Sequence, residues 1–364
     1  MGRTFQFSCA LVPLLTLLGC SDGIISTGSG GGGAGGSDQG QPTPTGGSSA
    51  SAAGSNQGSA GKASAGSGNV ATPGNPGEVG GCKMFPPDDD WNLDVSGLAV
   101  DTMWTAKLNE LVGDANIHPD YGVDGQDLYG IPINVVPENQ PLVDVVFEWY
   151  PEESDPGPYP FPGPDSVIIE GNNPEACDGD CHLIALQQGT CMLYEGYACE
   201  HSEGAWHCGN GAKWDLKRVG YGQREVGWTS ADAAGLAIAP GLLRYAEVRA
   251  GEVTHALRFT VNCTTDKYVK PATHQAVPGC NPDDGPPMGT RVRLKADYDI
   301  SGASPSAQTV LRGMKKYGMI LADNGSNFYF QGEANPGWTE EDIEPLKDVP
   351  ASAFEVVQMG VLMP

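Results

Sequence analysis

The sequence predicts a mainly β fold, a β-sandwich or jelly-roll-like domain with a few helices. Many short runs rich in β-branched and aromatic residues are separated by glycine and proline, as in antiparallel sheets. Few segments have helical periodicity, and the proline-rich stretch 155–164 cannot be a central strand. An α+β arrangement is the alternative.

Two segments have the apolar period of an amphipathic helix, and a third has a helix start signal. The first covers 102–112 and is followed by Gly113, a typical helix terminator. The second runs from Pro305 to Tyr317 after Ser304, which predicts an N-cap followed by proline in the first turn. A last short helix is expected from Thr339 to Lys347.

The remaining apolar runs predict strands. The run 253–261 alternates strictly, so His255 shares a face with apolar side chains and is expected to lie in the core. In chain order, the predicted strands cover 131–136, 142–150, 166–170, 181–187, 190–197, 211–217, 253–261, 268–274, 291–300, 319–322 and 327–331.

The N-terminus predicts export and lipid anchoring. Residues 1–20 combine Arg3 with an apolar stretch that is too short to span a bilayer, as in a signal peptide. The ending Leu17-Leu18-Gly19-Cys20 resembles a bacterial lipobox, which implies a palmitate-type lipid on Cys20. Ser21 then favours the outer membrane or cell surface. An ordinary signal peptide that happens to contain a cysteine is the alternative.

Composition divides the rest into a tether and one globular domain. Residues 21–80 are mainly small and polar, which predicts a disordered Gly/Ser-rich tether with a reach of roughly 45 Å. The domain is expected to cover 82–364. The chain has a net charge of −25, and residues 1–80 hold two basic and three acidic side chains, so the domain carries −24. Such a surface excludes nucleic acid as a partner.

Eight cysteines of the predicted domain favour disulfide bonds. An even number in an exported chain predicts up to four bridges, although eight cysteines allow 105 pairings. Cys263 and Cys280 could close a local loop, and Cys82 could fix the start of the domain. A zinc site built on Cys177 and Cys181 is the less favoured alternative.

One predicted hairpin brings a histidine and a glutamate together. A two-residue turn at Gln188-Gly189 would place His182 opposite Glu195 on the apolar face of the hairpin. Such a pair would be partly desolvated, which suits proton transfer, so both are candidate catalytic residues. A structural ion pair, or an edge pair facing solvent, is the alternative.

Cleavage of a glycosidic bond needs a second carboxylate, and binding needs a platform for the sugar. Asp215 and Asp323 are the candidates for the second carboxylate beside Glu195. Arg293 and Lys295 share one face of a predicted strand and could bind a substrate carboxylate. A solvated face neutralised by nearby carboxylates is the alternative. Trp214 and Trp228 are the candidate sugar-binding residues.

The sequence predicts no cofactor. His182, His255 and His274 could form a divalent-metal site, but their separations match no ligand signature. Gly-x-Ser-x-Gly, His-Glu-x-x-His and phosphate-loop motifs do not occur in the sequence. Common serine hydrolases, zinc proteases and nucleotide enzymes are therefore disfavoured.

Several segments resemble a group of exported bacterial proteins of uncharacterised function. The resemblance covers about half of the chain, places these segments in one domain and implies no catalytic residue. The matching stretches are 180–182, 193–195, Gly227-Trp-Thr-Ser-Ala-Asp-Ala-Ala-Gly235, Pro240-Gly-Leu-Leu-Arg-Tyr245, His255-Ala-Leu-Arg-Phe-Thr260, Pro286-Pro-Met-Gly289, Arg293-Leu-Lys-Ala296 and Tyr317-Gly-Met-Ile-Leu-Ala-Asp-Asn-Gly325.

Together these features predict a cell-surface lipoprotein that acts on extracellular polysaccharide as a glycoside hydrolase or a polysaccharide lyase. Its expected partners are extracellular carbohydrate and the membrane, reached through the lipid on Cys20. A non-catalytic carbohydrate-binding or adhesion lipoprotein is the alternative, with Trp206, Trp214, Trp228 and Trp338 stacking on sugars. A structural envelope protein is the third possibility. The sequence does not predict the oligomeric state.

Overall fold

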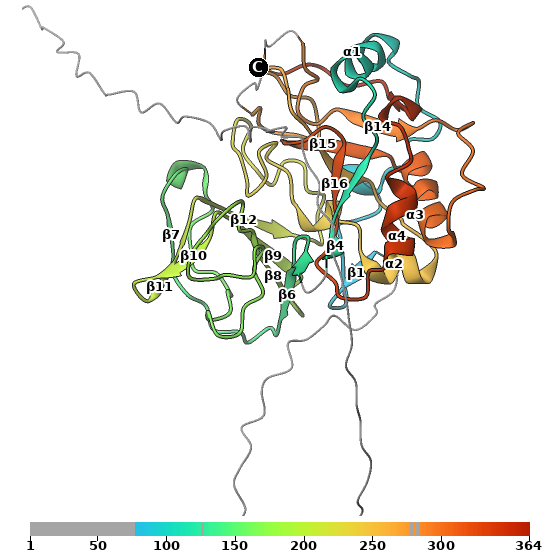
Figure 1. The fold of residues 1–364 in the computed structure, drawn as a ribbon. Helices are drawn as coiled ribbons and strands as arrows, with labels where there is room; N and C mark the ends of the chain where they lie inside the picture. The colour runs from blue at the N-terminus through green and yellow to red at the C-terminus, as the bar shows by residue number, and fades with distance from the viewer. Residues whose placement is uncertain (1–76, 125–126, 277–279, 281–283) are drawn as a thin grey trace, which may run out of the picture. The chain divides into compact units, whose positions relative to one another are not determined.

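The computed structural model describes residues 77–124, 127–276, 280 and 284–364 (Figure 1). The predicted signal segment, Cys20 and residues 21–76 lie outside these residues. The strands are β1 (Glu78–Val79), β2 (Cys82–Lys83), β3 (His118–Asp120), β4 (Gly122–Asp124), β5 (Asp127–Tyr129), β6 (Ile133–Val136), β7 (Val145–Phe147), β8 (Leu183–Gln187), β9 (Met192–Tyr197), β10 (Glu200–Ser202), β11 (Ala205–Cys208), β12 (Asn210–Asp215), β13 (Leu257–Val261), β14 (Arg291–Leu294), β15 (Met319–Asn324), β16 (Tyr329–Gln331) and β17 (Phe354–Val356). The helices are α1 (Thr102–Val112), α2 (Tyr245–Ala250), α3 (Pro305–Lys316) and α4 (Glu340–Ile343), with 3-10 turns that include η2 (Pro151–Glu153) and η3 (Ala239–Gly241).

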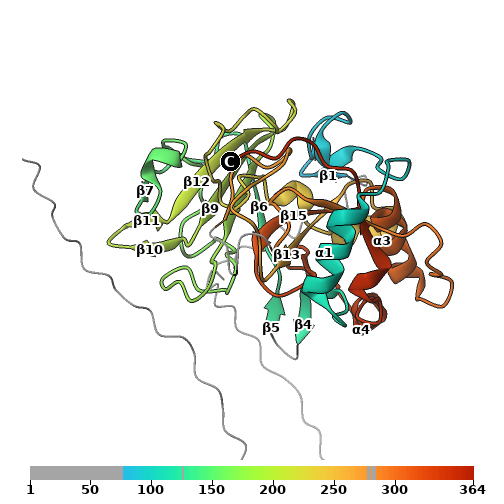
Figure 2. The ribbon, with the colours of Figure 1, turned by 90° about the horizontal axis from the view of Figure 1, so that it is seen from above.

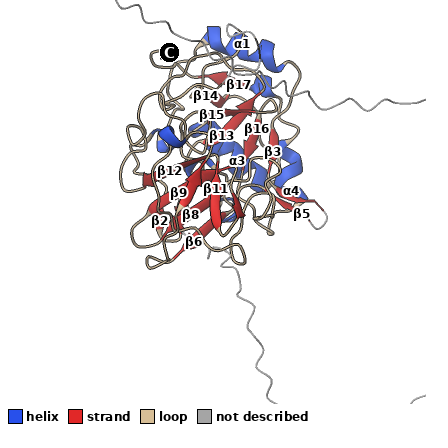
Figure 3. Ribbon diagram, turned by 90° about the vertical axis from the view of Figure 1, so that its left-hand side faces the viewer, coloured by secondary structure: helices blue, strands red, loops and turns tan. Residues whose placement is uncertain are grey.

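The prediction of a mainly β fold with a few helices is confirmed. A six-stranded sheet has the order β17-β14-β15-β13-β16-β3, and a four-stranded sheet has the order β12-β9-β8-β6. The two sheets lie side by side, as Figures 2 and 3 show from two directions. Parallel pairs occur in both, β13 with β15 and β6 with β8, and the sequence pattern did not predict them. Smaller sheets are β10-β11-β7, β1-β2 and β4-β5.

The six-stranded sheet holds the largest part of the core and is covered by helices. Helix α1 has the predicted bounds, and Asp101 caps it by accepting the N–H of Trp104. Helix α3 has the predicted cap, because Ser304 Oγ accepts the N–H of Ala307. Its apolar face, which includes Val310 and Met314, is buried in the core. Among the described residues, no helix is long and apolar enough to cross a membrane.

The β8–β9 hairpin forms, but the predicted register is wrong by two residues. Gln187 pairs with Met192, so the connection is longer than the two-residue turn expected. Ile184, and not His182, therefore lies opposite Glu195. A shift of two preserves the side-chain alternation, so His182 and Glu195 still belong to the same face of the sheet.

Some local predictions differ from the structure for identifiable reasons. Residues 166–170 form no strand, because the Asn134 side chain takes the place of a neighbouring strand and bonds both the N–H and the C=O of Ile168. Residues 268–274 make only isolated bridges around Tyr268, and Pro271 lacks the N–H that a ladder needs. Helix α2 was not predicted because six residues are too short for a periodic signal.

Four disulfide bonds join the eight cysteines. Cys263 pairs with Cys280, which confirms the predicted local loop, and Cys82 is bonded to Cys191 at a sequence separation of 109, which ties the start of the domain to β9 as expected. Cys177 pairs with Cys181, which contradicts the zinc alternative, and Cys199 pairs with Cys208. Among the described residues, the first strand is β1, which starts at Glu78, slightly before the predicted boundary at 82.

Candidate active site

A cavity of about 440 Å³ lies where the four-stranded and six-stranded sheets meet. Of the four candidate catalytic residues, only Asp323 lines it. The lining residues are aromatic, small or polar: Tyr150, Tyr197, Asn210, Thr229, Ser230, Ala231, Ala233, Asp266, His274, Gln275, Ala276 and Asp323.

Asp323 reaches the cavity from the carboxyl end of β15. The parallel neighbour β13 pairs Thr260 with Asp323 after a bulge that follows Phe259. The preceding residues of β15, 319–322, are fully buried, whereas the Asp323 side chain is 29% exposed. One carboxylate oxygen accepts the N–H of Asn324 at 2.7 Å, which fixes the side chain. Burial and the nearby Asp232 raise the pKa of Asp323 to about 7.

A buried ion pair lies behind Asp323. Arg258 Nε and Nη2 both donate to Asp232 Oδ2, at 3.2 and 3.0 Å, and the Ala234 N–H donates to Oδ1. Asp323 Oδ2 is 4.0 Å from Arg258 Nη2, which is beyond hydrogen-bond distance. Asp232 therefore neutralises the guanidinium directly, whereas Asp323 lies farther from it and faces the cavity. Burial raises the pKa of both carboxyl groups.

His182 and Glu170 form a second ion pair beside the same wall. His182 Nδ1 lies 2.6 Å from Glu170 Oε2, and Nε2 lies 3.1 Å from the carbonyl oxygen of Ala231, which lines the cavity. Burial alone would lower the pKa of His182, but the Glu170 carboxylate and its hydrogen bond raise it to about 9. The protonated ring therefore donates from both nitrogens and supports the wall from behind.

Glu195, the other half of the predicted pair, is fully enclosed by donors. It is 0% exposed and does not line the cavity. The Ile238 N–H contacts both carboxylate oxygens at 3.0 Å, the Ala239 N–H donates at 2.8 Å and the Trp214 indole N–H at 3.0 Å. Burial raises its pKa, against these hydrogen bonds. Glu195 thus holds the start of η3 against β9 and β12.

Three further candidates contact protein groups away from the cavity. Asp215 ends β12, and its carboxylate accepts the N–H of Lys217 in the turn that follows. Arg293 is 9% exposed, binds Glu355 at 2.8 Å and donates to three main-chain carbonyls. Lys295 donates to the carbonyl of Ser352. The basic face of 291–295 is therefore packed against protein, and the expectation of a solvated face is wrong for Arg293.

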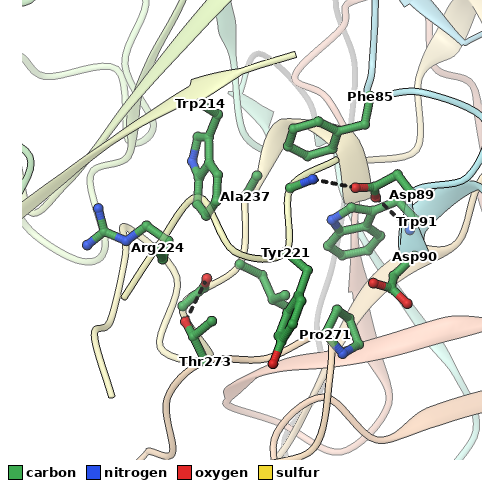
Figure 4. Close-up of a pocket in the computed structure, with 13 residues that line it drawn as sticks. Phe85, Asp89, Asp90, Trp91, Trp214, Tyr221, Arg224, Ala237, Pro271 and Thr273 are labelled. Carbon is green, nitrogen blue, oxygen red and sulfur yellow. Dashed lines mark hydrogen bonds between the residues drawn. The ribbon is translucent and has the colours of Figure 1, made fainter. Parts of the chain in front are cut away.

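The predicted sugar platforms differ in exposure. Trp214 is 2% exposed and faces a small cavity of about 10 Å³, drawn in Figure 4 with Phe85 and Tyr221. This space is about the size of one water molecule. Trp228 is half-buried under the Arg224 guanidinium, which lies 5.4 Å from its ring.

The three histidines suggested as a metal site are not brought together. His255 is buried as predicted, between Glu247 and the carbonyl of Ala256. His274 lines the cavity and contacts the carbonyl of Ala233. In the part of the chain that the structure describes, no group of three or more His, Cys, Asp or Glu side chains is arranged to hold a metal ion.

Sequence reasoning missed several residues of the cavity. Asn210 is 0% exposed, and neither polar atom of its side chain has a hydrogen-bond partner among the described residues. An unpaired buried amide is costly, so it marks a place where a ligand or water completes the bonding. Arg258 could have been noticed as a charged residue in the apolar strand 257–261. Nothing local singled out Tyr150 or Asn210.

Comparisons of the chain with protein-family models, with curated proteins and with solved structures found no match. The assignment of the cavity therefore depends on its own geometry and chemistry.

Proposed function

We propose that this chain is an exported, lipid-anchored glycoside hydrolase whose general acid is Asp323. One observation carries the proposal. A carboxyl group with a pKa of about 7 lines a cavity of about 440 Å³ whose walls include Tyr150 and Tyr197. Such a group holds a proton near neutral pH and can transfer it to a leaving oxygen. The tyrosine rings offer apolar surface and hydroxyl groups, which suit a sugar ring.

The proposed reaction uses two carboxyl groups of the same cavity. Protonated Asp323 gives its proton to the glycosidic oxygen as the bond to the anomeric carbon breaks. Water adds to that carbon and transfers a proton to the exposed carboxylate of Asp266, the other acidic residue of the lining. Asp232 and Arg258 act as positioning residues, because their charges act on Asp323 from behind and neither side chain lines the cavity.

Hydrolysis is favoured over the lyase reaction by the charges around the cavity. A lyase acting on a uronate needs cations to neutralise the substrate carboxylate. Neither lysine nor arginine is found among the described lining residues. Arg293 and Lys295, the candidates for binding a substrate carboxylate, donate to protein carbonyls. The preferred substrate is therefore a glycan without acidic groups.

The test replaces Asp323 with asparagine, which keeps the shape of the side chain but cannot donate an acidic proton. We expect turnover of neutral polysaccharides, measured as new reducing ends, to fall about 10²–10⁴-fold. Activity of the unmodified protein should decline as the pH rises through about 7, because the acid must be protonated. Asp215→Asn is the matched control and should keep full activity. Unchanged turnover in Asp323→Asn would refute the assignment.

A non-catalytic carbohydrate-binding lipoprotein is the second candidate. Two exposed aromatic side chains favour it, since Trp149 is 58% exposed and Tyr150 is 45% exposed. A folded protein that binds a polysaccharide but releases no reducing ends across a substrate panel would support this candidate and exclude hydrolysis of those polymers.

A further inference from the structure

The residues that follow β7 place an exposed aromatic ridge next to the cavity. The ridge consists of the exposed Trp149 and Tyr150 after β7 and the half-buried Tyr197 of β9, and both tyrosines line the cavity. Trp149 and Tyr150 both donate their main-chain N–H to the carbonyl of Gly209, at 3.2 and 3.1 Å. The two residues thus extend the β7 edge on a fixed backbone.

The Trp149 ring is held in place although most of the residue is exposed. It meets Tyr197 edge to face, with ring centroids 5.6 Å apart. It also covers Gly209, where an added Cβ would lie 2.7 Å from the indole ring. Only glycine leaves room for the ring in this position. The indole is therefore immobilised before any ligand binds, which reduces the entropy lost on binding.

Trp149 differs from the other tryptophans of the chain. Trp228 is half-buried, and the remaining five are at most 9% exposed. The buried ones are Trp91, Trp104, Trp206, Trp214 and Trp338. Trp149 is therefore the most exposed tryptophan of the chain, and its ring offers a ligand a contact surface next to the cavity.

We infer that Trp149 is an outer binding subsite for a polymeric glycan without acidic groups, continuous with the cavity that holds Asp323. This inference depends on the proposed function for its substrate class. An indole face can pack on the C–H face of a pyranose ring. Glu148, which contacts His207 at 2.9 Å, and Glu152 are close neighbours of the ridge in the chain, and the acidic domain disfavours a polyanionic polymer. A subsite outside the cavity has value only for a substrate longer than the cavity.

The test measures binding separately from turnover. Native gels are cast with hydroxyethyl cellulose, xylan or glycol chitin, or with polygalacturonate as the acidic polymer, and the retardation of each variant is compared. We expect at least one of the three non-acidic polymers, and not polygalacturonate, to retard the unmodified protein. Trp149→Ala should weaken this binding at least tenfold, and Trp149→Phe should retain most of it. Met103→Ala, which removes an exposed apolar side chain from α1, is the control.

The outcomes separate the subsite from the catalytic proposal. Retardation that is lost in Trp149→Ala but kept in Asp323→Asn supports the subsite, whether or not the protein releases reducing ends. If turnover is present, KM for the polymer should rise in Trp149→Ala while kcat and the KM for an aryl monoglycoside stay unchanged. Equal retardation of Trp149→Ala and the unmodified protein, or no retardation by any of the three non-acidic polymers, would overturn the inference.

Discussion

At the scale of single residues, the number of hydrogen-bond donors distinguishes two carboxylates, Glu195 and Asp323, that were both predicted to be catalytic. Glu195 is surrounded by four N–H contacts and has no surface for a substrate. Asp323 accepts one main-chain N–H, remains 29% exposed and lines a cavity. A carboxylate whose acceptor sites are all occupied by protein N–H groups stabilises a fold. A carboxylate with a free acceptor site can bind a ligand or exchange a proton.

Replacing Glu195 with glutamine should therefore destabilise the protein. The Ile238 N–H contacts both oxygens, so the new amide NH₂ must face an N–H donor in either orientation. We expect the free energy of unfolding to fall by about 2–3 kcal/mol, measured by urea denaturation. Asp215→Asn, at the end of β12, should change it by less than about 0.5 kcal/mol. A Glu195→Gln variant with unaltered stability but no turnover would restore Glu195 as a catalytic candidate.

At the scale of elements, the sequence predicts features that depend on local patterns. The predicted bounds of α1 and α3 agree with the structure within one residue, because the apolar period is accompanied by Gly113 in the first case and by Ser304 and Pro305 in the second. The β8–β9 hairpin was expected, but its turn length was not, because Gly189 fits both a two-residue and a four-residue connection. The shared face of His182 and Glu195 survives the shift, while their pairing does not.

Contacts between distant elements could not be read from the sequence. Nothing near Asp323 predicts that Arg258 and Asp232 lie behind it, since the parallel β13–β15 pair joins segments far apart in the chain. The same limit explains Arg293, whose basic strand face was expected to meet substrate or solvent. It meets the main chain of 95–98 and Glu355.

Arg293 should accordingly stabilise the packing of β14 against β17 and against residues 95–98. Arg293→Lys keeps the charge but cannot supply the same set of donors to three carbonyls and Glu355. We expect a loss of about 1–3 kcal/mol in unfolding free energy, with kcat unchanged. Lys295→Ala, which removes one exposed hydrogen bond to Ser352, should have little effect. Wild-type stability combined with a raised KM would instead indicate a substrate contact.

At the scale of the whole molecule, the cysteines favour an oxidising compartment. Four disulfide bonds suit an oxidising environment, and the acidic domain surface suits uncharged ligands. The lipobox-like ending at Cys20 adds a proposed attachment to the membrane. These features bear on the location of the protein and not on its reaction, which is proposed from the cavity alone.

The attachment is tested by changing Cys20 to alanine in cells that express the full chain. We expect labelled palmitate to be incorporated into the unmodified protein and not into Cys20→Ala, because no other thiol occupies the lipobox-like position. The variant should also leave the membrane fraction. Cys9→Ala, in the same predicted signal segment, is the control and should label normally. Labelling that persists in Cys20→Ala would place the lipid on another residue, and absence of label from the unmodified protein would indicate an ordinary signal peptide.

The disulfide between Cys82 and Cys191 also defines how the molecule would transmit mechanical tension. If the chain is anchored at Cys20 and a bound polymer is pulled, the force from the anchor enters the described fold at β1. It reaches Cys82 a few residues later. The disulfide passes this force directly to Cys191, which immediately precedes β9. Strand β9 ends at Tyr197, which lines the cavity. The load path from anchor to ligand is thus one covalent bridge and one strand, and most of the chain between Cys82 and Cys191 lies outside it.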